Sequence, residues 1–181
     1  NLGAFGDGGA ITTSRKDVAS RARALRHLGQ MRKGEHLLAG YNERLDTLQA
    51  AVLAVKLPEL NAANDSRRAA AARYAERLPE SIARPAPREG SLDVHHLYPV
   101  RVPDPQGLQA ALGERGVGTG FHYSPAVHQH PPFAELLRES GGRAEFPEAE
   151  AWAAEELSLP IFAGMTEAEV DYVCEAVAAA L

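Results

Sequence analysis

The sequence predicts an α/β protein. Stretches with apolar residues at helical spacing alternate with short stretches of β-branched and aromatic residues, and this alternation is typical of the class. The second half holds two to three such strand-like stretches. The chain has 181 residues, of which 45% are hydrophobic and 24% are charged. These values fit one globular domain, or one small domain plus part of another.

The first forty residues predict a strand, a helix and a polar loop. A Gly-rich start leads into Ile11, Thr12 and Thr13, which indicates a turn followed by a strand. Ser14 and Asp17 have the spacing of a capping box, and the helix that they open is expected to end near residue 28. The segment 29–40 is too polar for a core and predicts a loop that carries ligand contacts.

The strongest helical pattern lies between residues 45 and 78. Leu45, Leu48, Val52 and Val55 recur at helical spacing. Pro58 must interrupt or kink this helix, because proline lacks the N–H donor and clashes with the preceding turn. A linker then separates a domain of residues 1–80 from a second domain of residues 91–181. The linker, 81–90, is marked by Pro79, Pro85, Pro87 and Gly90.

The second domain predicts short strands between helices. Asp104 is expected to cap a helix with Pro105 at its first position, a favoured place for proline. Thr166 and Glu169 predict a capping box for the last helix. The other expected elements are a strand over 94–102, a strand over 117–123, helices around 133–138 and 147–156, and an extended stretch over 157–162.

Charge and hydropathy exclude two classes of partner. The net charge is −5 and basic residues form no sustained block, which argues against a nucleic-acid surface. The apolar runs are too short for a transmembrane helix, so no membrane partner is predicted. No signal peptide is visible, and a cytoplasmic location is therefore expected.

Cysteine and histidine usage predicts neither a disulfide nor a metal site. Cys174 is the single cysteine and is expected to be a buried apolar residue of the last helix. His122, His128 and His130 lie close together, but no acidic residue accompanies them at ligand spacing. We therefore predict no bound metal.

Two short segments have the chemistry of a binding site. The segment from Gly40 to Asp46 is expected at a helix start, where free N–H groups suit a phosphate, and Asn42 and Arg44 would add donors. Plain capping by Asn42, with Arg44 in solvent, explains the same residues. His122 and Tyr123, at the end of a short strand, can bind hydroxyls and assist proton transfer. An edge strand with an exposed His and a packed Tyr is the alternative.

Several segments, in the right order along nearly the whole chain, resemble the sugar aminotransferases of the DegT/DnrJ/EryC1/StrS family. They are Asn-Leu-Gly with Gly-Asp-Gly-Gly-Ala (1–10), Gly-Tyr-Asn-Glu-Arg-Leu-Asp with Leu-Gln-Ala-Ala (40–51), Val-Lys-Leu-Pro with Arg-Arg and Tyr74 (55–74), Gly-Val-Gly-Thr with His-Tyr-Ser-Pro and His128 (116–128), and Leu-Ser-Leu-Pro-Ile-Phe with Met-Thr (157–166). In this family the first segment directly follows the Schiff-base lysine. The resemblance therefore implies that this lysine comes immediately before Asn1, and that residues 1–181 hold no catalytic residue.

The resemblance also implies a fold and a site. The fold would be the fold type I, aspartate aminotransferase-like architecture of pyridoxal 5′-phosphate (PLP) enzymes, with the end of the large domain followed by a small C-terminal α/β domain. Members act as homodimers with shared active sites, and Asn42 would bind the PLP phosphate of the neighbouring subunit. The substrate-binding residues would be Lys33, His36, Arg44, His122, Tyr123 and His128.

The implied reaction transfers an amino group from an amino acid, glutamate, to a ketone carbon of a nucleotide-linked deoxysugar. PLP would act as the electron sink and the lysine would move the proton. Three alternatives remain: a sugar dehydratase with His in place of the lysine, an aminocyclitol aminotransferase, and a non-catalytic sensor domain. The residue before Asn1 separates the transferase from the dehydratase.

Overall fold

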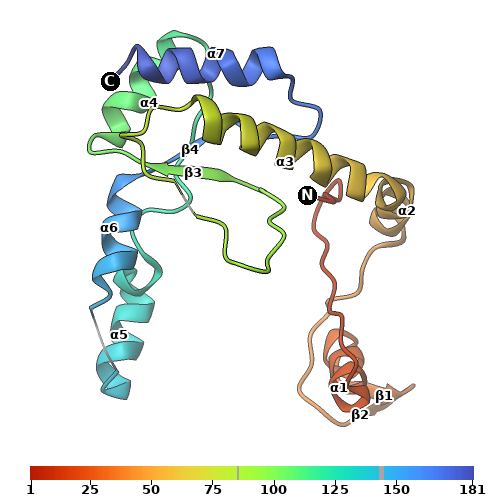
Figure 1. Ribbon diagram of the computed structural model, residues 1–181. Helices are drawn as coiled ribbons and strands as arrows, with labels where there is room; N and C mark the ends of the chain where they lie inside the picture. The colour runs from red at the N-terminus through yellow and green to blue at the C-terminus, as the bar shows by residue number, and fades with distance from the viewer. Residues whose placement is uncertain (85, 143–144) are drawn as a thin grey trace. The chain divides into compact units, whose positions relative to one another are not determined.

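The computed structural model describes residues 1–84, 86–142 and 145–181, and its architecture is mixed α/β as predicted (Figure 1). The chain divides into two compact units, Asn1–Leu60 and Asn61–Leu181. The domain boundary predicted at 81–90 stays a prediction. Pro85, one of its markers, lies outside the described residues.

The first unit contains two helices and a small hairpin. Helix α1 spans Lys16–Arg26, and α2 spans Thr47–Lys56 and continues into a 3-10 turn, η1, at Leu57–Glu59. Strands β1 (Gln30–Arg32) and β2 (Glu35–His36) pair antiparallel. The loop expected over 29–40 is thus a hairpin. Pro58 lies in the 3-10 turn, so the predicted interruption of the helix is confirmed.

Two predictions for the start of this unit were wrong. Residues 11–13 form no strand, and α1 begins at Lys16 without a side-chain cap. The reason is competition from Arg15, whose guanidinium Nη2 binds Asp17 Oδ2 at 2.5 Å. The Arg15 N–H donates to Thr13 Oγ1 at 3.1 Å. The carboxylate that would have completed the capping box with Ser14 is therefore occupied.

Close backbone contact closes the base of the hairpin. Gly29 has a φ of +76°, and a Cβ there would lie 1.7 Å from the Leu38 carbonyl oxygen. A Cβ at Gly40 would lie 2.0 Å from the Gly29 nitrogen. Both positions therefore require glycine.

The second unit packs helices on a two-stranded sheet. Strand β3 (Tyr98–Arg101) pairs antiparallel with β4 (Glu156–Leu159). The strand expected over 117–123 is wrong: this segment contributes an isolated bridge between Gly120 and Ser158. The helices are α3 (Leu60–Arg77, whose first residue belongs to the first unit), α4 (Pro105–Glu114), α5 (Pro131–Ser140), α6 (Pro147–Glu155) and α7 (Glu167–Ala178), with a 3-10 turn, η2, at Val127–Gln129.

Both helix caps predicted in this unit are confirmed. Asp104 Oδ1 accepts the Gly107 N–H at 2.9 Å at the start of α4. At the start of α7, Thr166 Oγ1 accepts the Glu169 N–H at 3.3 Å, and the Glu169 carboxylate accepts the Thr166 N–H at 2.7 Å. These reciprocal bonds satisfy donors that a helix start leaves free.

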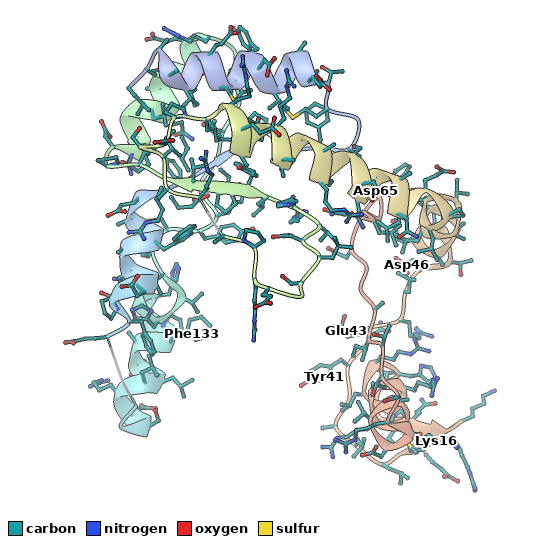
Figure 2. The ribbon with its side chains drawn as sticks, viewed as in Figure 1. Lys16, Tyr41, Glu43, Asp46, Asp65 and Phe133 are labelled. Atoms are coloured by element: carbon teal, nitrogen blue, oxygen red, sulfur yellow. The ribbon has the colours of Figure 1, made fainter. Side chains whose placement is uncertain are left out.

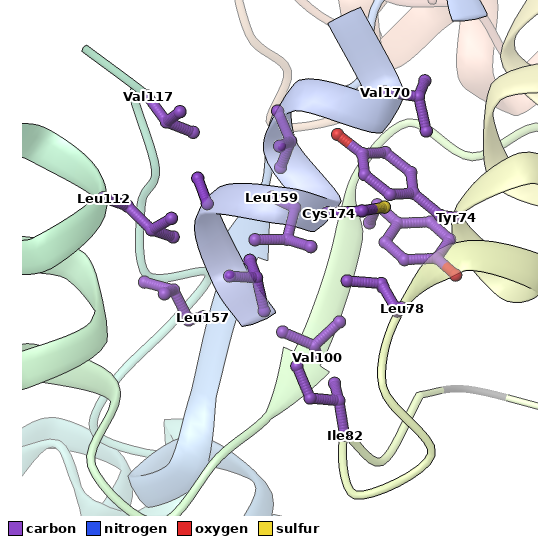
Figure 3. Packing of buried hydrophobic residues seen from close by; sticks show 14 of the residues in the cluster. Tyr74, Leu78, Ile82, Val100, Leu112, Val117, Leu157, Leu159, Val170 and Cys174 are labelled. Atoms are coloured by element: carbon purple, nitrogen blue, oxygen red, sulfur yellow. The ribbon is translucent and has the colours of Figure 1, made fainter. Parts of the chain in front are cut away.

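The core of this unit lies between the sheet and helices α3, α4 and α7 (Figure 3). Tyr74 is fully buried and stacks on Tyr98, with ring centroids 4.8 Å apart. Leu157 and Val100 from the two strands are also fully buried, and each such side chain contributes about 1.5–3 kcal/mol of hydrophobic free energy. Cys174 is buried in this cluster as predicted, and burial raises the pKa of its thiol to about 11.

Candidate functional site

The hairpin of the first unit presents two adjacent cations beside a surface depression. Arg32 and Lys33 are exposed, and Gly34, with a φ of +86°, forms the turn beside them. The depression measures about 630 Å³ and is lined by His27, Gln30, Met31, Arg32, Lys33 and Gly34. This arrangement can attract an anionic group such as a pyrophosphate. Lys33 thus lies where a nucleotide contact is possible.

His36 has its ring engaged within the hairpin. Its Nδ1 lies 2.8 Å from the Leu28 carbonyl oxygen, to which it donates, and its Nε2 lies 3.2 Å from the Gln30 side-chain amide, from which it accepts. Both ring nitrogens are thus in contact with other groups of the hairpin. His36 therefore holds the hairpin together.

Asn42 and Arg44 lie in an extended segment before helix α2. Figure 2 shows their neighbours Tyr41, Glu43 and Asp46 along this segment. The expectation of a helix start at Asn42 is wrong, because α2 begins at Thr47 with Asp46 as N-cap and Asn42 forms a β-bridge with His27.

The Asn42 side chain is oriented by its neighbour. Arg44 Nε donates to Asn42 Oδ1 at 3.3 Å. The amide oxygen accepts this bond, and the amide nitrogen carries two N–H donors of the kind that suits a phosphate oxygen.

Two polar residues of α2 hold the Gly-rich N-terminal segment, and sequence reasoning missed both. Lys56 Nζ donates to the Gly3 carbonyl oxygen at 2.5 Å, and Gln49 Oε1 accepts the Phe5 N–H at 2.8 Å. Gln49 and Lys56 are seven residues apart, which places them on one face of the helix. Polar residues at this spacing on a largely apolar helix were the available signal.

The second unit contains a cavity that includes His122. It measures about 340 Å³ and is lined by His96, Leu97, Gly118, Thr119, Gly120, His122, Ser158, Leu159, Pro160 and Ile161. Thr119 Oγ1 and His122 Nδ1 are buried and have no hydrogen-bond partner within the described ranges. Buried polar atoms normally have partners, so these two mark a place for a ligand or water.

Tyr123 lies next to this cavity but outside its lining. Its side chain is 76% exposed, and its ring meets that of His122 edge-on at 5.3 Å between centroids. The structure therefore separates the two residues that the sequence paired: His122 faces the cavity and Tyr123 faces solvent.

Two residues of α3 fix the cavity wall. Arg67 Nη1 donates to the carbonyl oxygens of His95 at 3.2 Å and Ile161 at 3.0 Å, and so joins the segments before β3 and after β4. Tyr74 donates its hydroxyl to the Pro160 carbonyl at 2.8 Å. Arg67 and Tyr74 belong to segments that resemble the family, but their contacts span 28 to 94 residues of sequence.

His128 is tied to helix α6. Its Nε2 lies 2.8 Å from Glu150 Oε1, which also accepts the Phe146 N–H at 2.8 Å. The Phe146 amide and then His128 hold the pKa of the Glu150 carboxyl below its usual value. The His128 ring also contacts the Phe146 ring edge-on, with centroids 4.8 Å apart. His128 lies outside the cavity lining, so the structure does not bring it together with His122.

Within residues 1–84, 86–142 and 145–181, no group of three or more His, Cys, Asp or Glu side chains is arranged to hold a metal ion. In the same ranges, every helix is too short or too polar to cross a bilayer.

Comparison with known proteins identifies the family. Residues 1–178 match the model of the DegT/DnrJ/EryC1/StrS aminotransferase family. The chain is 41% identical over 182 residues to a pleiotropic regulatory protein of Geobacillus stearothermophilus, covering 98% of this chain and 48% of that protein. It is 41% identical over 171 residues to dTDP-3-amino-3,6-dideoxy-alpha-D-galactopyranose transaminase of Aneurinibacillus thermoaerophilus, covering 94% of this chain and 46% of the relative.

Solved structures agree with the sequence relatives. The crystal structure of DesV from S. venezuelae superposes with a TM-score of 0.87 at 36% identity, over 97% of this chain and 47% of that one. A family aminotransferase from Brucella abortus gives a TM-score of 0.86 at 28% identity, over 98% and 47%. The chain spans about half the length of the relatives it matches. By sequence and by fold, this chain belongs to the DegT/DnrJ/EryC1/StrS aminotransferase family.

Proposed function

We propose that the complete protein is a PLP-dependent aminotransferase that places an amino group on a ketone carbon of a nucleotide-linked deoxysugar, with glutamate as amino donor. The observation that carries this proposal is the family match over residues 1–178. Relatives from Aneurinibacillus thermoaerophilus and Streptomyces venezuelae are named as transaminases of dTDP-linked amino sugars. Another, from Acidithiobacillus ferrooxidans, is named as an aminotransferase of a UDP-linked sugar.

In this proposal each unit serves the nucleotide sugar separately: Lys33, His36 and Arg44 face the substrate of the neighbouring subunit's site, and His122 lines a sugar pocket. Lys33, with Arg32 beside it, binds the pyrophosphate by charge. Arg44 contributes a further cation near the nucleotide, and His36 supports the hairpin that presents Lys33. His122 and the hydroxyl of Thr119 bind the sugar, since both have buried polar atoms that lack partners within the described residues. Tyr123, whose ring meets that of His122, would lie at the outer side of the sugar site. His128, which Glu150 holds outside the cavity lining, would act further from the sugar.

The chain also offers a fitting group for the PLP phosphate. The Asn42 amide accepts a hydrogen bond from Arg44 through its oxygen, and its two N–H donors are the groups that we propose for the phosphate. In the family pattern it acts across a homodimer, in the neighbouring subunit's site. PLP when bound supplies the electron sink for the reaction. A cytoplasmic homodimer is part of this proposal.

Borohydride reduction of the complete protein, followed by peptide mass spectrometry, tests the chemistry. We expect a reduced PLP adduct on a lysine directly before Asn1, and conversion of the cofactor to its amine form when glutamate is added. A histidine at that position would replace the proposal by a sugar dehydratase. An intact lysine with no cofactor adduct would favour a non-catalytic sensor domain, a role in keeping with the regulatory name of the Geobacillus relative.

A variant tests the role of Asn42. Asn42→Ala in the complete enzyme is expected to release PLP more readily on dialysis, because the phosphate loses a hydrogen-bond donor. Asn61→Ala, which alters an exposed asparagine of α3, is the control. Equal PLP retention in the two variants would remove Asn42 from the cofactor site.

A functional assay with cyclitol and nucleotide-linked ketones then separates the aminocyclitol alternative from the sugar substrate.

A further inference from the structure

Strand β4 forms backbone hydrogen bonds along both of its edges, and residues at the second edge line the cavity. On one edge it pairs with β3, and the Val102 N–H donates to the Glu155 carbonyl at 2.9 Å. On the other edge, Ser158 and Gly120 exchange backbone bonds of 2.8 and 3.3 Å. Backbone groups of successive residues in a strand point to opposite edges. The backbone groups of Glu156 and Ser158 therefore both face the segment 120–122.

The antiparallel register predicts the next pair on that edge. Moving two residues from the Gly120–Ser158 bridge brings His122 opposite Glu156. In a continued ladder the His122 N–H would donate to the Glu156 backbone carbonyl. Instead it donates to the Glu156 side chain, at 2.7 Å from Oε2. A carboxylate thus takes the place of a ladder carbonyl, and strand pairing ends at Gly120.

The carboxylate that does this is buried. Glu156 is 1% exposed, and its other oxygen, Oε1, accepts the Ser158 hydroxyl at 2.5 Å. Burying a carboxylate costs free energy that hydrogen bonds must offset, whereas an apolar residue would fill the same volume without that cost. We therefore look for the role of Glu156 in its two hydrogen-bond donors, the His122 N–H and the Ser158 hydroxyl.

Both of those groups belong to the cavity. Ser158 and His122 are among its lining residues, and His122 Nδ1 is one of two buried atoms of that lining that lack a partner within the described residues. Glu156 itself lies outside this lining. Glu156 contacts the lining from outside the cavity, through its hydrogen bond to the His122 backbone N–H.

We propose that Glu156 is a positioning residue for the sugar site: its buried carboxylate replaces the strand carbonyl opposite His122 and sets the place of His122 and Ser158 in the cavity wall. This inference rests on the proposed function, in which His122 contacts the sugar. Glu156 touches neither substrate nor cofactor in this account, and it acts through His122.

Amide hydrogen exchange of the complete, PLP-loaded enzyme tests the contact directly. Glu156→Leu removes the acceptor, and the peptide that contains His122 is expected to exchange about tenfold faster. Glu155→Leu is the matched control, because the neighbouring Glu155 binds Arg101 at the surface and leaves His122 untouched. Glu156→Gln keeps an oxygen acceptor without charge, so its exchange is expected to lie between wild type and Glu156→Leu.

Binding of two stable probes, dTDP-glucose and UDP-N-acetylglucosamine, tests the consequence. Glu156→Leu is expected to lower the affinity for whichever nucleotide sugar wild type binds by about tenfold. The affinity for dTDP or UDP alone should change by less than about twofold. Such a split between sugar and nucleotide is not expected from a general loss of stability. Glu155→Leu should bind both kinds of probe as wild type does.

The outcomes separate this inference from the proposed function. If amide exchange at His122 is unchanged in Glu156→Leu, the positioning role is overturned, whatever the result of the probe-binding measurements. Faster exchange with unchanged sugar-nucleotide affinity overturns its link to the sugar site. If wild type binds neither probe nor the free nucleotides, the proposed function fails, while exchange still decides whether Glu156 holds His122. Should Glu156→Leu fail to fold, the same exchange measurement on Glu156→Gln decides, and wild-type exchange there overturns the inference.

Discussion

Tyr74→Phe removes one oxygen atom from the centre of the second unit, and its effect can be worked out from the structure. Tyr74 is fully buried, and its hydroxyl donates to the Pro160 carbonyl at 2.8 Å. Burial raises the pKa of this phenol, so the hydroxyl keeps its proton at neutral pH. Phenylalanine fills the same volume. The variant therefore loses the hydrogen bond and leaves the packing against Tyr98 in place.

The expected cost follows from the acceptor that is left behind. A partly buried carbonyl without its partner costs about 1–2 kcal/mol. For a domain of roughly 150–250 residues this lowers the thermal unfolding midpoint by about 2–8 °C. The assay is thermal unfolding of the complete enzyme, compared at one protein and one PLP concentration because ligand binding and assembly shift the midpoint.

Tyr172→Phe is a matched control. The Tyr172 hydroxyl also donates to a carbonyl at 2.8 Å, that of Arg115, but the side chain is 52% exposed and water can replace the bond. Its free energy of unfolding should stay within about 0.5 kcal/mol of that of wild type. Equal shifts in the two variants, or no shift in Tyr74→Phe, would refute the argument that burial of the Pro160 contact makes it valuable.

Three further outcomes are expected. Thr166→Ala removes the cap of α7 and should lower the free energy of unfolding by about 1 kcal/mol in urea titrations, whereas Thr166→Ser should not. The hydrogen bond from Arg73 holds the pKa of Asp171 below its usual 3.8, so the stability from this pair is present above pH 3.8 and is lost as the pH falls through the lowered pKa. Acid unfolding of Asp171→Asn should lack that component, and an unchanged acid limb would contradict it. Lys33→Ala should weaken UDP or dTDP binding most at low salt, while Lys16→Ala, outside the hairpin depression, should not.

Local chemistry explains which elements the sequence predicts correctly. The cap at Asp104 and the capping box at Thr166 form because their partners lie three residues away, and nothing nearby competes. Ser14 and Asp17 have the same spacing, but Arg15 binds the carboxylate first. A pattern of spacing predicts a cap only where adjacent charges leave the capping groups available.

The strand expected over 117–123 fails for a different reason. Its residues are suitable for a strand, and Gly120 does pair with Ser158. Pairing then stops because the Glu156 side chain accepts the His122 N–H. Glu156 and His122 are 34 residues apart in sequence. A contact of this kind depends on register and burial, and neither periodicity nor a local motif contains it.

The same difference between local pattern and long-range contact applies to the site residues. Sequence identifies which residues have useful chemistry, but it does not count the partners that each already has. His36 and Lys33 are both cationic candidates from sequence. In the structure, the ring nitrogens of His36 are spent on Leu28 and Gln30, while Lys33 lies exposed at the turn. Of these two candidates, Lys33 is therefore the one that we propose for binding an anion.

Asn42 keeps its proposed role although its predicted position at a helix start is wrong. The helix starts five residues further along, at Thr47. The structure shows instead a hydrogen bond from Arg44 to the Asn42 amide oxygen. An asparagine that only capped a helix would use its oxygen on backbone N–H groups of that helix. Because Arg44 donates to that oxygen, the two Asn42 N–H donors are the groups that we propose for the PLP phosphate.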